Sequence, residues 1–167
     1  MKKIILIGFA CCGKSVVGKV LADKLGYAFV DTDCEIEKRS DLTVSEIFKH
    51  YGEKRFRQME SELLALLSKC ENTVVSCGGG SVLADNFNIF AQNSVIVWLT
   101  ATAPTVLSRL GNTSRPLFDK LSEQELDEFI GRRSAVYRDY AEAQFVTDDK
   151  TPQQVAEEIC KYVTAKN

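Results

Sequence analysis

The sequence predicts an α/β fold built from parallel strands and the helices that connect them. Short apolar runs alternate with longer segments of helical periodicity, and several of these runs lead directly into glycine or aspartate. This alternation is typical of βαβ units that share one parallel sheet. A chain of 167 residues with ordinary apolar and charged fractions is long enough for a substantial core, so we expect residues 1–167 to form a single domain.

The first strand and helix enclose a phosphate-binding motif. An apolar run at residues 4–7 precedes the sequence Gly8-Phe9-Ala10-Cys11-Cys12-Gly13-Lys14-Ser15, which has the P-loop pattern G-x-x-x-x-G-K-[ST]. Backbone N–H groups and the helix dipole form an anion cradle in such a loop, and we expect Lys14 to reach phosphates and Ser15 to bind Mg²⁺. The alternative is a tight turn with an exposed lysine. Cys11 stands where many P-loops have glycine, so either Cys11 adopts a positive φ with some strain or the turn differs slightly from the usual P-loop.

The second strand, residues 27–30, leads into Asp31-Thr32-Asp33. Ligands of an open parallel sheet bind beyond the carboxyl ends of its strands, so both carboxylates should lie at the same edge as the P-loop. One can serve Mg²⁺, and the other can accept a hydrogen bond from a substrate hydroxyl that loses its proton. The alternative is that Asp33 only caps the helical segment that follows it.

Two helical segments follow. Thr43 and Glu46 have the spacing of a capping box, and Gly52 is expected to interrupt the helix that this box begins. A longer helix is expected over residues 53–69, with an apolar side formed by Phe56, Met59, Leu63, Leu66 and Leu67. Arg57 and Glu60 are three residues apart, so they can form an exposed pair, or Glu60 can orient Arg57 toward an anionic ligand.

A strand at residues 73–76 runs into Gly78-Gly79-Gly80. Three glycines in a row cost backbone entropy, and they suit a place where a ligand approaches the main chain closely. A flexible linker is the alternative. The next strand, residues 95–99, and a helix at 104–110 are followed by a polar segment at 109–117, which contains Arg109 and Arg115 and is expected to move over bound phosphates.

A helix is expected after the capping box of Ser122 and Glu125. Its apolar stripe includes Arg133 at a position where an apolar residue is expected, so the guanidinium must meet either a protein carboxylate or a carboxylate substrate. The last strand is expected at residues 145–147. Thr151 and Pro152 then begin the terminal helix.

Charge and composition exclude several classes of protein. The net charge of −2 gives no basic surface for nucleic acid, and no apolar stretch reaches the length of a membrane span. The apolar run near the N-terminus is interrupted by Gly8 and lacks a cleavage site, so we expect a cytoplasmic protein. The six scattered cysteines have no C-x-x-C spacing and there is one histidine, His50, so neither zinc nor disulfides are expected.

These residues together predict a kinase for a small hydroxy acid. The P-loop binds the donor phosphates, the aspartates suit an alcohol acceptor, and Arg57 and Arg133 suit an acceptor with a carboxylate. One alternative is another small-molecule kinase, acting on gluconate or on a nucleotide. The other is a non-catalytic nucleotide switch that contacts a protein partner.

The chain resembles the shikimate kinases over essentially its whole length. The resemblance rests on an ordered set of motifs: the P-loop, Asp31-Thr32-Asp33, Phe56-Arg57, Gly78-Gly79-Gly80, Arg115-Pro116-Leu117, and Arg133 followed by Tyr137. It implies a three-layer αβα fold with strand order 2-3-1-4-5 and a mobile lid at about 110–122, and shikimate-binding helices at about 34–60. It also implies a monomeric cytoplasmic enzyme that uses ATP and Mg²⁺ to phosphorylate the 3-hydroxyl of shikimate.

The resemblance also implies a role for individual residues. Asp33 would hold the shikimate hydroxyls and assist deprotonation, Arg57 and Arg133 would bind the carboxylate, and the Gly79 backbone would contact the ring substituents. Lys14 and Arg115 would stabilise the transferred phosphoryl group, and Ser15 would bind Mg²⁺ with Asp31 acting through water. The implied ATP-binding residues are Cys11, Cys12, Gly13, Lys14, Ser15, Val16, Arg115 and Lys150. Cys11 and Cys77 depart from the family pattern, in which glycine and threonine are usual.

Overall fold

The computed structural model describes residues 2–110 and 122–166, so Arg115 and most of the expected lid lie outside the described residues. The strands are β1 (Lys3–Ile7), β2 (Ala28–Asp31), β3 (Thr73–Ser76), β4 (Ser94–Thr100) and β5 (Ala143–Val146). The helices are α1 (Lys14–Leu25), α2 (Thr32–Ser40), α3 (Val44–Leu67), α4 (Phe87–Phe90), α5 (Ala103–Leu110), α6 (Glu123–Tyr140) and α7 (Pro152–Thr164), and a 3₁₀ turn, η1, spans Ser81–Leu83.

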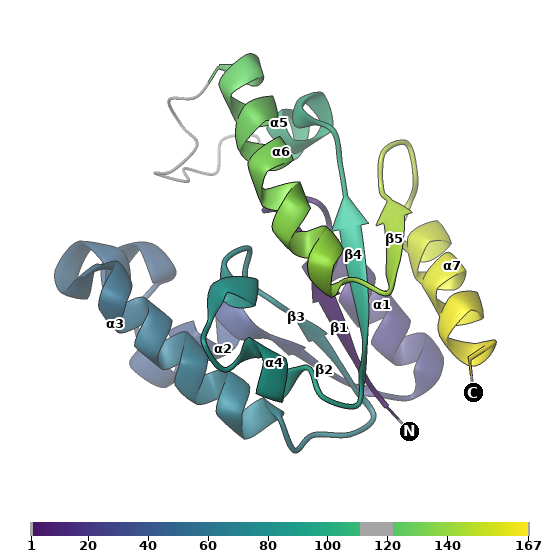
Figure 1. Cartoon of the computed structure of the whole chain (residues 1–167), viewed down its shortest axis with the longest axis horizontal. Coiled ribbons are helices and arrows are strands. Elements are labelled where there is room, and N and C mark those ends of the chain that lie inside the picture. Colours follow the sequence, from purple (N-terminus) through teal and green to yellow (C-terminus); the bar gives the residue numbers. More distant parts are fainter. Residues whose placement is uncertain (1, 111–121, 167) are drawn as a thin grey trace.

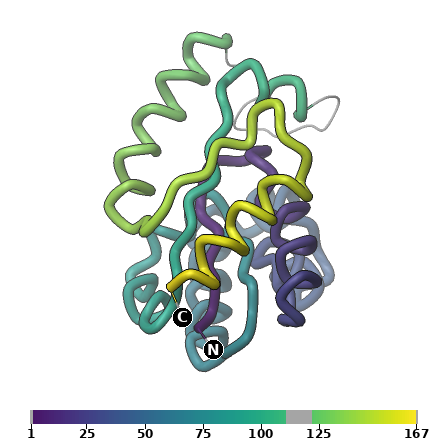
Figure 2. Tube along the Cα trace, turned by 90° about the vertical axis from the view of Figure 1, so that its right-hand side faces the viewer, coloured from purple at the N-terminus to yellow at the C-terminus, as the bar shows by residue number. Residues whose placement is uncertain are grey.

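The strands form one sheet in the order β2-β3-β1-β4-β5, and every neighbouring pair is parallel (Figure 1). Helices cover both faces. In Figure 2, α1 and α6 lie on opposite sides of the sheet, and α7 runs along the same layer as α1. The structure therefore confirms the three-layer αβα fold and the strand order that the resemblance implied.

The core is centred on β1, which is buried along its whole length because it pairs with β3 on one side and β4 on the other. The edge strand β2 is only partly buried. On α7, Val155, Ile159 and Val163 face the core. The prediction for Leu66 on α3 is wrong, since its side chain is 58% exposed and Leu64 is buried in its place.

Most element boundaries follow the sequence signals. Capping boxes begin α3, α6 and α7, and Gly52 (φ 77°) interrupts α3 as expected. Strand β5 begins two residues earlier than predicted, and the short elements η1 and α4 were not predicted because they are too short for a periodic pattern. None of the described helices is both long and apolar enough to span a membrane.

Candidate active site

Strand register brings the predicted site residues to one edge of the sheet. Leu6 of β1 is paired with Ser76 of β3, and Ser76 is paired in turn with Asp31 of β2. The segments that follow these three strands, namely the P-loop, the start of α2 and the triple-glycine loop, therefore leave the sheet side by side. This is the carboxyl edge, where parallel α/β proteins bind their ligands.

The backbone of the P-loop decides between the two alternatives for Cys11. Cys11 has a φ of 59° and Gly13 a φ of 94°, so Cys11 adopts the left-handed conformation that glycine takes more easily. Gly8 is required for a different reason. A Cβ atom there would lie 2.3 Å from the carbonyl oxygen of Leu99, so the loop can begin beside β4 only if this residue has no side chain.

Lys14 lies inside this loop rather than in solvent. Its side chain is 8% exposed, and Nζ donates hydrogen bonds to the carbonyl oxygens of Gly8 (2.9 Å) and Phe9 (2.7 Å). The Cys12 sulfur is 3.7 Å from the same nitrogen. The alternative of a turn with an exposed lysine is therefore wrong, and the ammonium group is held where the loop encloses it.

Oxygen ligands gather next to the P-loop. The Ser15 hydroxyl donates a hydrogen bond to Oδ2 of Asp31 and lies 3.5 Å from the Ser76 hydroxyl. Hydroxyl and carboxylate oxygens are the donors that Mg²⁺ prefers, and a kinase site needs only one or two of them beside phosphates and water. The residues present therefore fit a magnesium ion.

Asp31, not Asp33, caps the following helix. Oδ1 of Asp31 accepts hydrogen bonds from the backbone N–H groups of Asp33 (3.1 Å) and Cys34 (3.2 Å), which begin α2. The alternative that Asp33 serves as the cap is wrong. The cap instead fixes the first turn of α2, and this turn carries the Asp33 side chain toward the triple-glycine loop.

The triple-glycine loop is a place of close approach and not a linker. A Cβ atom at Gly78 would lie 2.6 Å from Oδ1 of Asp33, and one at Gly80 would lie 2.5 Å from both terminal nitrogens of Arg57. The Gly78 N–H also donates to the Thr32 hydroxyl at 2.9 Å. The glycines thus let the carboxylate of Asp33 and the guanidinium of Arg57 lie directly against the main chain.

Arg57 is held by a buried partner. Its Nη1 donates to Oε2 of Glu60 at 2.8 Å, and Glu60, which is 0% exposed, also accepts a 2.6 Å hydrogen bond from the Ser81 hydroxyl. Glu53 contributes a second, exposed contact at 3.2 Å. Burial acts to lower the pKa of Arg57, but the two glutamates outweigh it and raise this pKa. The pair is not a surface pair, which favours the orienting role of Glu60.

Arg133 reaches the site from α6. Its guanidinium lies 5.7 Å from the centre of the Phe129 ring, and this ring packs edge-on against Phe9 of the P-loop at 5.7 Å. Nη1 of Arg133 is buried and has no hydrogen-bond partner among residues 2–110 and 122–166. A protein carboxylate was the alternative partner for this nitrogen, and no such partner is present in the described part of the chain.

Two residues make contacts that the sequence did not predict. Arg109 was expected only in a segment that moves over phosphates, but its guanidinium joins the P-loop to the end of β5, because Nη1 donates to the Cys11 carbonyl (3.3 Å) and to Oγ1 of Thr147 (2.9 Å). Tyr137 was named only as part of the motif that follows Arg133, and its hydroxyl donates to the Gly79 carbonyl at 2.7 Å. The phenol hydroxyl of Tyr137 was the one feature of the sequence that indicated a polar partner for this side chain.

Lys150, which the resemblance assigns to ATP binding, forms an ion pair with Glu158 at 2.8 Å.

Comparison with known proteins identifies the family. The shikimate kinase family model matches residues 10–164. The chain belongs to the shikimate kinase family. The shikimate kinase of Caldicellulosiruptor bescii is 39% identical over 99% of this chain and 98% of that protein. The shikimate kinase of Thermodesulfovibrio yellowstonii is 40% identical over 96% of this chain and 94% of that protein.

Solved structures of shikimate kinases have the same fold. The Acinetobacter baumannii shikimate kinase in complex with shikimate has a TM-score of 0.92 and 30% identity, and the match covers 100% of this chain and 95% of that one. The Aquifex aeolicus shikimate kinase has a TM-score of 0.80 and 33% identity, with coverage of 98% and 97%. A deoxyadenosine kinase from M. mycoides, at 17% identity and a TM-score of 0.66, shares the fold alone.

Proposed function

We propose that this chain transfers the γ-phosphoryl group of ATP to the 3-hydroxyl of shikimate, giving shikimate 3-phosphate and ADP. The reaction belongs to aromatic amino acid biosynthesis. Membership of the shikimate kinase family supports this activity over the full length of the chain. The observation that carries it in the site itself is the position of the Arg57 guanidinium, which lies against Gly80 at the edge where the P-loop begins.

We assign the acceptor side of the site to four residues. Arg57 and Arg133 bind the shikimate carboxylate, because two guanidinium groups can share its oxygens through charge-assisted hydrogen bonds. The Gly79 main chain contacts the ring substituents. Asp33 orients the reacting hydroxyl and accepts its proton as the O–P bond forms. Nη1 of Arg133 supports this assignment, since it is buried and no described residue accepts its hydrogen bond, which leaves a donor for an anionic ligand.

The donor side is the P-loop. Its backbone N–H groups bind the ATP phosphates, and Lys14 neutralises charge on the transferred group once its amine turns from the carbonyls of Gly8 and Phe9 toward that group. Arg115 is assigned the same role from the resemblance, as are Val16 and Lys150 in ATP binding. Ser15 would hold Mg²⁺, with Asp31 acting through water. When bound, this ion would offset the negative charge of the phosphates.

The test is acceptor-dependent formation of ADP. The protein would be given ATP with and without Mg²⁺, and with shikimate, gluconate or a nucleoside monophosphate as acceptor, in an assay coupled to ADP release. We expect turnover only with shikimate and only with the metal. Turnover with gluconate or a nucleotide would overturn the proposed acceptor, and slow hydrolysis indifferent to every acceptor would instead favour a nucleotide switch.

We further propose that residues 1–167 act as one kinase domain, and that the enzyme works as a monomer in the cytoplasm. The small net charge and the motif order, which accounts for the whole chain, support this proposal. Light scattering coupled to size exclusion would measure the mass. A dimer that persists at nanomolar concentration would overturn the monomer.

A further inference from the structure

Tyr137 connects the two sides of the site that bind the acceptor. It lies on α6, four residues after Arg133 and therefore on the same face of the helix. Its hydroxyl donates a 2.7 Å hydrogen bond to the carbonyl oxygen of Gly79, the middle residue of the triple-glycine loop. The helix that carries Arg133 and the loop that carries Gly79 are thus joined by one hydrogen bond between residues 58 positions apart.

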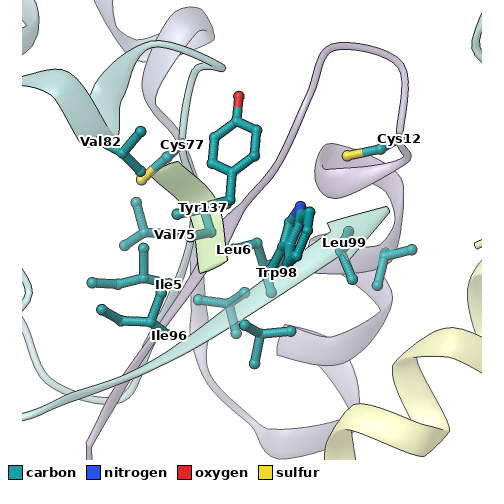
Figure 3. Close-up of a cluster of buried hydrophobic side chains, with 14 of the residues drawn as sticks. Ile5, Leu6, Cys12, Val75, Cys77, Val82, Ile96, Trp98, Leu99 and Tyr137 are labelled. Carbon is teal, nitrogen blue, oxygen red and sulfur yellow. The ribbon is translucent and has the colours of Figure 1, made fainter. Parts of the chain in front are cut away.

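The packing of the Tyr137 ring sets the direction in which its hydroxyl points. The side chain is 2% exposed, and its ring lies 6.0 Å from the ring of Trp98 on β4. Figure 3 shows the two rings side by side within the apolar cluster, with the Tyr137 hydroxyl pointing out of this cluster. Burial raises the pKa of this phenol far above its usual value of 10.0, so it keeps its proton and remains a donor.

Gly79 lies between this donor and the P-loop. A Cβ atom on Gly79 would lie 3.6 Å from the Tyr137 oxygen and 3.8 Å from both the Ala10 nitrogen and the Gly8 carbonyl oxygen, which are ordinary contact distances. The residue therefore has α6 on one side and the P-loop on the other. Because a peptide group is planar, a bond that fixes the Gly79 carbonyl also fixes the direction of the next N–H group.

We infer that Tyr137 is a positioning residue for shikimate: its hydroxyl holds the Gly79 peptide in the orientation that contacts the ring, and keeps this peptide in register with Arg133. The inference rests on the proposed function, in which Gly79 and Arg133 bind the same substrate. Tyr137 acts through Gly79 and is not itself assigned a contact with the reacting atoms.

The test removes one oxygen atom by the substitution Tyr137→Phe. The partly buried Gly79 carbonyl would lose the donor that fixes its direction, so we expect the KM for shikimate to rise about fivefold to tenfold. The KM for ATP should change less than about twofold, because the P-loop keeps its own hydrogen bonds. Calorimetric titration with shikimate alone should give the same loss of affinity without any turnover.

Tyr162→Phe is the matched control. Tyr162, on α7, also donates its hydroxyl to a backbone carbonyl, that of Glu142 at 3.2 Å, but this bond lies between α7 and the segment before β5. The control should leave both KM values unchanged. Thermal melting of both variants would establish that they are folded.

Three outcomes of the Tyr137→Phe experiment would overturn the inference: an unchanged shikimate KM, an equal rise in both KM values, or a loss matched by Tyr162→Phe. Failure of the proposed function is separate, because the unsubstituted protein would then show no shikimate-dependent ADP formation at all. If Tyr137→Phe does not fold, Gly79→Pro gives a second test. It retains Tyr137 but fixes φ of residue 79, directly before the carbonyl that Tyr137 binds, and the inference expects it to weaken shikimate binding more than ATP binding.

Discussion

The charge of Glu60 provides the sharpest test of how the acceptor site is held together. The substitution Glu60→Gln retains the size of the side chain and removes its charge. Breaking a fully buried ion pair costs about 3–5 kcal/mol, but the Arg57 side chain is 32% exposed and keeps a second contact to Glu53. The glutamine can still accept one hydrogen bond. We therefore expect the free energy of unfolding to fall by about 2 kcal/mol, which corresponds to a melting temperature about 4–8 °C lower.

Glu53→Gln is the matched control, because Glu53 pairs with the same guanidinium from a position that is 65% exposed. Exposed pairs four residues apart on a helix contribute about 0.3–0.5 kcal/mol, so this variant should melt within about 2 °C of the unsubstituted protein. Urea unfolding followed by circular dichroism measures both free energies. The shikimate KM should rise only for Glu60→Gln, since only Glu60 also holds Ser81 beside the glycine loop. Equal effects of the two substitutions would refute the argument that burial gives Glu60 its importance.

Three further predictions concern Lys14, Arg133 and Asp148. Lys14→Met should lower kcat by about a thousandfold or more in the ADP assay, because stabilisation of transferred phosphate is worth several kcal/mol, and near-normal turnover would contradict the P-loop assignment. Arg133→Ala should raise the shikimate KM by about thirtyfold. The matched control is Arg132→Ala, at the exposed neighbouring residue, which should leave this KM unchanged. Tight binding of shikimate to folded Arg133→Ala would count against the carboxylate role. Burial acts to raise the pKa of Asp148, but hydrogen bonds from Thr102 and Thr105 outweigh it and lower this pKa from 3.8 to about 2. The stability that Asp148 contributes, about 1 kcal/mol after solvent screening, is therefore present above about pH 4 and lost as the pH falls toward 2. In urea unfolding, Asp148→Asn should have a lower free energy of unfolding than the unsubstituted protein at about pH 7, and this difference should disappear near pH 2.

Local chemistry in the sequence was sufficient for the donor half of the site. The P-loop could be predicted because its function depends on backbone N–H groups, and the glycines, lysine and serine that shape them are consecutive in the chain. The positive φ of Cys11 was one of two alternatives that this pattern allowed, and the structure decided between them. The carboxyl ends of β1, β2 and β3 could also be placed at one edge, because parallel strands leave a sheet at the same side.

Only the tertiary structure decided how Arg57, Glu60 and Asp33 are held beside the glycine loop. The spacing of Arg57 and Glu60 is equally compatible with an exposed pair, and it is the packing of α3 against the glycine loop that buries Glu60. Sequence also left open whether Asp33 serves the site or only caps the helix that follows it, and the structure gives the capping role to Asp31 instead. The contacts of Tyr137 and Arg109 were not predicted because their partners, Gly79 and Cys11, lie 58 and 98 positions away in the sequence. These contacts form only in the folded chain, so no local pattern indicates them.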